Sequence, residues 1–144
     1  MPTVTTISHS PEETRALGRA YGAGARRGQV FALDGDLGAG KTQFVKGLAE
    51  AAGYTGEVTS PTFPLLHEYL PNDLEAPAIY HFDFYRLKSA EEVLDLDFDD
   101  YLESRGIMVI EWASKFPEVL PAETRWLRFE IGEGDERRIV ETRR

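Results

Sequence analysis

The chain has 144 residues, a length typical of one domain, and we expect a single domain across residues 1–144. It contains no cysteine, which excludes disulfides and cysteine-ligated metal sites, and its apolar runs are too short to span a bilayer. The net charge of −9 argues against a protein that grips nucleic acid with a basic surface of its own. The N-terminus has no signal-peptide pattern, so the sequence predicts a cytoplasmic protein without membrane contact.

The first third of the chain predicts two strand–helix pairs. Residues 3–8 resemble a strand, and Ser10–Glu13 forms a capping-box pattern that opens a helix expected to run to about Arg26. The apolar run 29–33 predicts a buried strand, and apolar residues at helical spacing predict a helix over 42–52. These segments alternate as in an α/β protein.

The remaining elements predict further strands and one helical region. After a loop at 55–64, residues 65–70 and 78–84 are strand-like, and their short connection predicts an antiparallel hairpin. A second capping box predicts a helical region over 89–104, and the β-branched run 107–110 predicts a strand buried on both faces. Two last strands are expected at 125–131 and 137–142, separated by a glycine-containing turn.

The loop between the strand at 29–33 and the helix at 42–52 carries the most specific motif. Its letters GDLGAGKT match GxxxxGK[ST], the phosphate-binding P-loop. Glycines there allow positive φ and bring backbone N–H groups close to an anion, Lys41 supplies a charge for the outer phosphates, and Thr42 supplies a hydroxyl for Mg²⁺. The residues expected to contact the nucleotide from this region are Gly35, Asp36, Leu37, Gly38, Ala39, Gly40, Lys41, Thr42 and Gln43.

Together, these elements and the motif predict an α/β fold, a P-loop NTPase-like three-layer sandwich. Its mixed sheet is expected to be parallel near the P-loop and antiparallel at one edge.

Two carboxylates and one threonine are candidates for the second half of the site. Asp83 and Glu111 each close an apolar strand, a costly position unless the carboxylate is paired or bound to metal. P-loop enzymes hold Mg²⁺ with such a carboxylate, and the pattern leaves open which of the two does so. Thr62 occupies the loop where P-loop switch proteins place a threonine near Mg²⁺ and the outer phosphate.

The segments GDLGAGKT, VTSPTF, HFDFYRL and IEW together resemble the TsaE family over nearly the whole chain. The resemblance implies an ATPase, slow alone, that serves the threonylcarbamoyladenosine modification of tRNA. It implies TsaD- and TsaB-like proteins as partners, with tRNA reached only through that complex, and ATP and Mg²⁺ as cofactors.

The resemblance also implies roles for individual residues. Lys41, Asp83, Glu111 and Thr62 would be catalytic. Thr42 and Glu111 would hold Mg²⁺. Pro11 and Arg137 match positions that line the nucleotide in the family. The chain departs from the family pattern at Gln43, where a second hydroxyl residue is usual, and around Asp97, where a glycine is common.

Some interpretations remain open on the residues alone. A small-molecule or nucleoside kinase needs an acceptor pocket and an arginine lid, and the short acidic region after Asp83 argues against it. A nucleotide-gated protein-binding switch is a third possibility. The acidic segment 91–103 suits a solvated helix face or a docking face for a basic protein. His81 is more typical of a structural histidine than of a base, and Trp112 suits either packing or the nucleotide site.

Overall fold

The computed structural model describes residues 3–36, 38–59 and 65–142. Its elements in chain order are β1 (Thr3–Ser8), α1 (Pro11–Ala23), β2 (Val30–Asp34), α2 (Lys41–Ala51), β3 (Leu66–Tyr69), β4 (Ile79–Asp83), α3 (Ala90–Leu94), α4 (Phe98–Glu103), β5 (Ile107–Glu111), the 3₁₀ helices η1 (Ala113–Lys115) and η2 (Pro117–Val119), β6 (Arg125–Ile131) and β7 (Arg137–Thr142). In this part of the chain, no helix combines the length and the apolar composition needed to cross a membrane.

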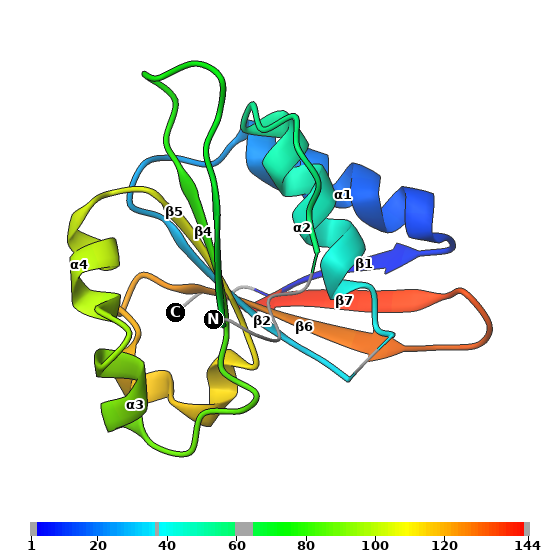
Figure 1. The fold of residues 1–144 in the computed structure, drawn as a ribbon. Coiled ribbons are helices and arrows are strands. Elements are labelled where there is room, and N and C mark those ends of the chain that lie inside the picture. Colours follow the sequence, from blue (N-terminus) through cyan, green and yellow to red (C-terminus); the bar gives the residue numbers. More distant parts are fainter. Residues whose placement is uncertain (1–2, 37, 60–64, 143–144) are drawn as a thin grey trace.

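One mixed sheet organises the fold. Within the described residues it has seven strands in the order β1-β7-β6-β2-β5-β4-β3 (Figure 1). The four inner strands β6, β2, β5 and β4 run parallel, and antiparallel pairs lie at both ends of the sheet. Our expectation of one antiparallel edge was therefore incomplete. The turn after β6 folds β7 back against it, and β7 then pairs with β1, which adds a second antiparallel edge.

Helices cover both faces of the sheet, so the three-layer prediction is confirmed. Figure 1 shows α1 and α2 on one side and α3 and α4 on the other. The side chains of β2 divide between the two cores, because successive residues of a strand point to opposite faces. Phe31 and Leu33 belong to the core under α1 and α2, whereas Val30 and Ala32 belong to the core that includes Phe98 of α4. This division explains why the first four residues of β2, 30–33, are all apolar.

Helices α1 and α2 approach each other closely at glycines. A Cβ atom added to Gly18 would lie 2.0 Å from the carbonyl oxygen of Phe44, and one added to Gly47 would lie 1.9 Å from that of Arg15. Both separations are far below any real Cβ contact, so the two backbones meet without side chains between them. This contact holds the first turn of α1 beside the first turn of α2.

Helix α1 stops at Ala23, earlier than the expected Arg26. The helical region predicted over 89–104 consists of two helices, α3 and α4. The break lies at Asp97, whose φ of 59° is in the left-handed region. Val93 and Phe98 are both fully buried in the same core, yet five positions on one continuous helix would point them about 140° apart. The break lets both side chains reach the core.

The close helix contact predicts that Gly47→Ala destabilises the protein. Although alanine favours helix formation, its methyl group has no room beside the Arg15 carbonyl, so we expect a loss of about 1–3 kcal/mol. Urea unfolding followed by circular dichroism measures this loss. Gly24→Ala is the matched control, because its Cβ would approach no atom closer than 3.9 Å. Equal stability of the two variants would contradict the proposed tight contact.

Candidate functional site

The glycine-rich loop between β2 and α2 adopts backbone conformations that glycine favours. Gly35, Gly38 and Gly40 have φ values of 150°, 83° and 98°. A Cβ atom on Gly35 would also lie 2.6 Å from the carbonyl oxygen of Phe129, so the loop passes too close to β6 for a larger residue. Gly40 is the residue before the first turn of α2. The loop therefore delivers the chain to a helix N-terminus, where free N–H groups favour an anion.

Lys41 is a buried cation at the start of α2, with 5% of its surface exposed. Its ammonium donates a hydrogen bond to the carbonyl oxygen of Gly35, lies 3.9 Å from Oε1 of Glu111, and sits 4.5 Å from the ring centroid of Trp112. Burial lowers the pKa of Lys41, while the carboxylates of Glu111 and Asp83 oppose that shift. The ammonium is thus surrounded by a carbonyl oxygen, a carboxylate and an aromatic ring.

Asp83 and Glu111 are the last residues of β4 and β5 and are paired in register. Because the two strands are parallel, both carboxylates emerge at the same edge of the sheet, and both are buried. Oδ1 of Asp83 accepts a hydrogen bond from the Tyr85 amide at 2.8 Å. Burial raises the pKa of Asp83, and the neighbouring Glu111 charge adds to this effect. The two strand-end carboxylates that the sequence singled out thus lie at one edge of the sheet, and Glu111 lies beside Lys41.

His81 also meets this group, from the middle of β4. Its Nε2 lies 2.7 Å from Oε2 of Glu111, so the histidine is more than a core residue that fills space. No local sequence pattern predicts this contact, because the two residues lie on neighbouring strands thirty positions apart in the chain.

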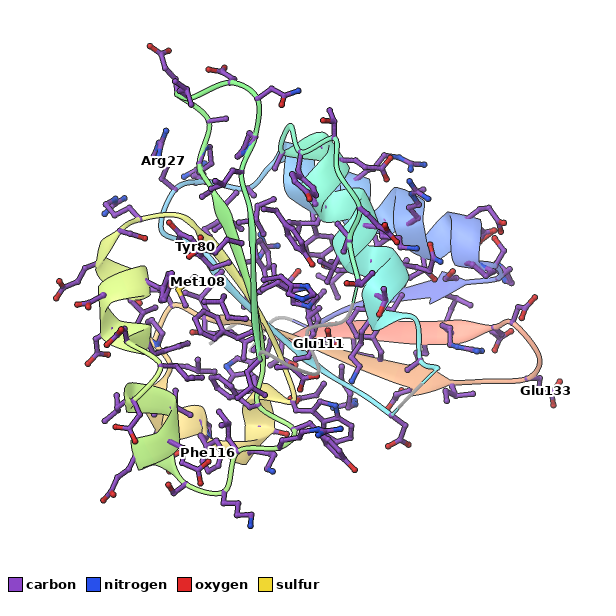
Figure 2. All side chains as sticks on the ribbon, viewed as in Figure 1. Arg27, Tyr80, Met108, Glu111, Phe116 and Glu133 are labelled. Carbon is purple, nitrogen blue, oxygen red and sulfur yellow. The ribbon has the colours of Figure 1, made fainter. Side chains whose placement is uncertain are left out.

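A cavity of about 370 Å³ opens in front of the loop and the buried lysine. Its lining residues are Pro11, Thr14, Gly38, Ala39, Gly40, Lys41, Thr42, Gln43, Glu111, Asp135 and Arg137. Figure 2 shows Glu111 near the N-terminal end of α2, whereas Glu133 marks the tip of the β6–β7 hairpin. The cavity thus joins the glycine-rich loop, the start of α1 and the start of β7.

The cavity contains most of the residues predicted from the sequence. Gly35 and Asp36 instead line a separate hollow beside β6, although the Gly35 carbonyl accepts the Lys41 hydrogen bond. The predictions for Leu37 and Thr62 fall outside the described residues.

Two lining residues, Thr14 and Asp135, were not predicted. Thr14 lies one helical turn after Pro11, so helical periodicity was a usable signal for it. Asp135 lies in the turn between β6 and β7, where the sequence had no comparable pattern.

Arg137 ties the β6–β7 hairpin to the loop. Its Nε donates to the carbonyl oxygen of Gly38 at 3.1 Å, and its Nη1 donates to the carbonyl oxygens of Gly134 and Glu136, each at 2.8 Å. The guanidinium is therefore placed beside the cavity by three backbone carbonyls.

The donor set suits a cation that needs few protein ligands. The described residues contain no group of three or more His, Asp or Glu side chains arranged around a metal position. Thr42 and Glu111 do share the cavity wall, and one hydroxyl with one carboxylate is a donor set that fits Mg²⁺, which keeps several waters and binds phosphate oxygens. These residues therefore fit the predicted Mg²⁺ site.

Comparison with known proteins identifies the family. A sequence model described as "Threonylcarbamoyl adenosine biosynthesis protein TsaE" matches residues 8–140. The chain belongs to the TsaE family. Family members similar to it include proteins named tRNA threonylcarbamoyladenosine biosynthesis protein TsaE from Bacillus subtilis and from Treponema pallidum. The first is 44% identical over 92% of this chain and 81% of the relative, and the second is 40% identical over 82% and 84%.

A solved structure supports the fold of this TsaE family member. The crystal structure of Bacillus subtilis YdiB is similar, with a TM-score of 0.81 and 36% sequence identity over 99% of this chain and 86% of that one. The α/β fold that we predicted is therefore shared with an experimentally determined structure.

The raised pKa of Asp83 predicts a gain in stability from Asp83→Asn. A carboxyl group whose pKa is raised in the folded state destabilises the protein at every pH above its ordinary value of 3.8, and most above the raised value. Asparagine removes the charge and can still accept the Tyr85 hydrogen bond. We therefore expect a higher Tm for the variant at about pH 8 and a shrinking difference as the pH falls toward that ordinary value.

Thermal unfolding across this pH range tests the prediction. Asp99→Asn, on an exposed position of α4, is the control and should change Tm little. A lower Tm for Asp83→Asn at about pH 8 would show that the buried carboxylate stabilises the free protein, contrary to this account.

Proposed function

We propose that this chain is an Mg²⁺-dependent ATPase that acts as an accessory protein in the synthesis of threonylcarbamoyladenosine in tRNA. Family membership supports the role in that modification. The geometry supports the nucleotide: a glycine-rich loop, a helix N-terminus and a buried cation meet at one cavity. The family relationship favours this role over a kinase or a non-hydrolysing switch.

The single observation that carries the proposal is the position of Lys41. Its ammonium donates to the Gly35 carbonyl and faces Glu111, and it lies on the wall of the cavity. A phosphate oxygen of ATP would offer the ammonium a stronger, charged acceptor. Loop N–H groups at the start of α2 would orient the same phosphates.

The two carboxylates and Thr42 would complete the site. Thr42 and Glu111 would hold Mg²⁺, which when bound neutralises charge on the phosphates. Asp83, held by the Tyr85 amide next to Glu111, would orient the attacking water. Pro11 and Thr14 would enclose the nucleotide from the side of α1.

The proposal also includes dependence on partner proteins. Arg137 lies beside the cavity, but its guanidinium already donates hydrogen bonds to three backbone carbonyls, one of them in the glycine-rich loop. An arginine that stabilises the transition state accelerates phosphoryl transfer by orders of magnitude, so we infer that the isolated chain is slow and that TsaD- and TsaB-like proteins activate it. The net charge of −9 supports contact with tRNA through those proteins rather than directly.

A turnover assay tests this function. We expect the purified chain to release phosphate from ATP slowly and the addition of TsaD and TsaB to raise the rate by roughly ten-fold or more. Lys41→Ala should remove both rates, because it deletes the only side-chain cation on the α2 side of the cavity wall among the described residues, while the fold persists.

Three outcomes would contradict the proposal. Full turnover by Lys41→Ala would contradict the phosphate-binding role of the loop. Equal rates of turnover with and without TsaD and TsaB would contradict the dependence on partners. Tight, salt-sensitive tRNA binding by the chain alone, measured by filter binding at low salt, would replace the indirect role with a direct one.

A further inference from the structure

Three buried side chains on adjacent strands form a row of hydrogen-bonded groups that ends at Glu111. Tyr69 ends β3, His81 lies in β4, and Glu111 ends β5. The Tyr69 hydroxyl lies 3.0 Å from Nδ1 of His81, and Nε2 of His81 lies 2.7 Å from Oε2 of Glu111. All three residues are at most 3% exposed, so water does not compete for these contacts.

His81 is held at both of its ring nitrogens. The carboxylate of Glu111 can only accept, so Nε2 of His81 donates to it, and the Tyr69 hydroxyl is the hydrogen-bond partner of Nδ1. Burial raises the pKa of Tyr69 above its ordinary value, which keeps the proton on the hydroxyl at neutral pH. The same hydroxyl donates to the carbonyl oxygen of Thr59 at 3.1 Å, which fixes the position of the hydroxyl beside His81.

The row leaves the two oxygens of Glu111 with different partners. Oε2 faces His81, and Oε1 is the atom 3.9 Å from the Lys41 ammonium. Glu111 also lines the cavity, whereas His81 is completely buried behind it. His81 therefore acts on the cavity through Glu111 and does not reach a molecule bound there.

We propose that His81 is a positioning residue, which holds Oε2 of Glu111 so that Oε1 faces the cavity, and that Tyr69 fixes the orientation of His81. This inference rests on the proposed function, since Glu111 needs a fixed orientation only if the cavity binds ATP with Mg²⁺. Groups that orient a ligating side chain from behind typically change metal affinity or activity by 10- to 100-fold when removed.

The variants His81→Ala, His81→Gln and Tyr69→Phe test the proposal. Calorimetry measures ATP affinity without Mg²⁺, and turnover with TsaD and TsaB measures the Mg²⁺ concentration needed for half the maximal rate. We expect His81→Ala to raise that concentration by about ten-fold and to lower kcat, with ATP affinity in the absence of Mg²⁺ unchanged. Glutamine keeps an N–H donor near the position of Nε2, so His81→Gln should recover much of the loss. Tyr69→Phe should lie between the two.

His67→Gln is the matched control. His67 lies opposite His81 on β3, and its Nδ1 is 3.4 Å from the same Tyr69 hydroxyl, but it is one strand further from Glu111. The control should keep the Mg²⁺ dependence of the unchanged protein. A shift in the control as large as that of His81→Ala would overturn the proposal.

The remaining outcomes separate this inference from the proposed function. If the unchanged protein neither binds nor hydrolyses ATP, the proposed function fails. If the unchanged protein is active, the Mg²⁺ dependence of the variants decides the role of His81. His81 only fills the core if Tyr69→Phe and His81→Gln both keep the Mg²⁺ dependence of the unchanged protein, and if His81→Ala either keeps it as well or does not fold. Equal loss of ATP affinity with and without Mg²⁺ in folded His81→Ala would also overturn the positioning role, because it would indicate general damage to the cavity.

Discussion

The candidate site depends on the burial of one ammonium beside two carboxylates at the carboxyl edge of a parallel sheet. An isolated buried charge is penalised by several kcal/mol, so Lys41, Asp83 and Glu111 are tolerated there because they face one another. The balance is incomplete, since burial lowers the pKa of Lys41 and raises that of Asp83. An anion bound beside Lys41 and a cation bound beside the carboxylates would each improve this charge balance. We therefore propose that this incomplete charge balance favours the binding of ATP and Mg²⁺ at the cavity.

Backbone packing brings the rest of the cavity to this charge cluster. The glycine contacts between α1 and α2 set the distance between the two helices, and they place Pro11 and Thr14 against the loop. On the other side, Arg137 fastens the β6–β7 hairpin to Gly38. The cavity is consequently built from segments at both ends of the chain, and its shape depends on contacts far from the charged residues.

The sequence predicted what depends on local pattern and missed what depends on long-range packing. Alternating or continuous apolar runs located the strands, and the P-loop motif indicated Lys41 as a charged residue of the cavity that it lines. Strand-end position was enough to bring Asp83 and Glu111 together, because parallel strands end at one edge. By contrast, the second antiparallel edge requires β1 to pair with β7, some 130 positions away. The contact between Tyr69 and His81 likewise depends on strand register, which local pattern does not reveal.

The most direct test of the account is a crystal structure of this chain with Mg²⁺ and a non-hydrolysable ATP analogue. We predict the phosphates against the loop N–H groups and the Lys41 ammonium, with the Gly35 hydrogen bond of Lys41 exchanged for a phosphate oxygen. We predict Mg²⁺ at Thr42 and on the Oε1 side of Glu111, with Oε2 still held by His81. A nucleotide bound outside this cavity, or phosphates without contact to Lys41, would contradict the account.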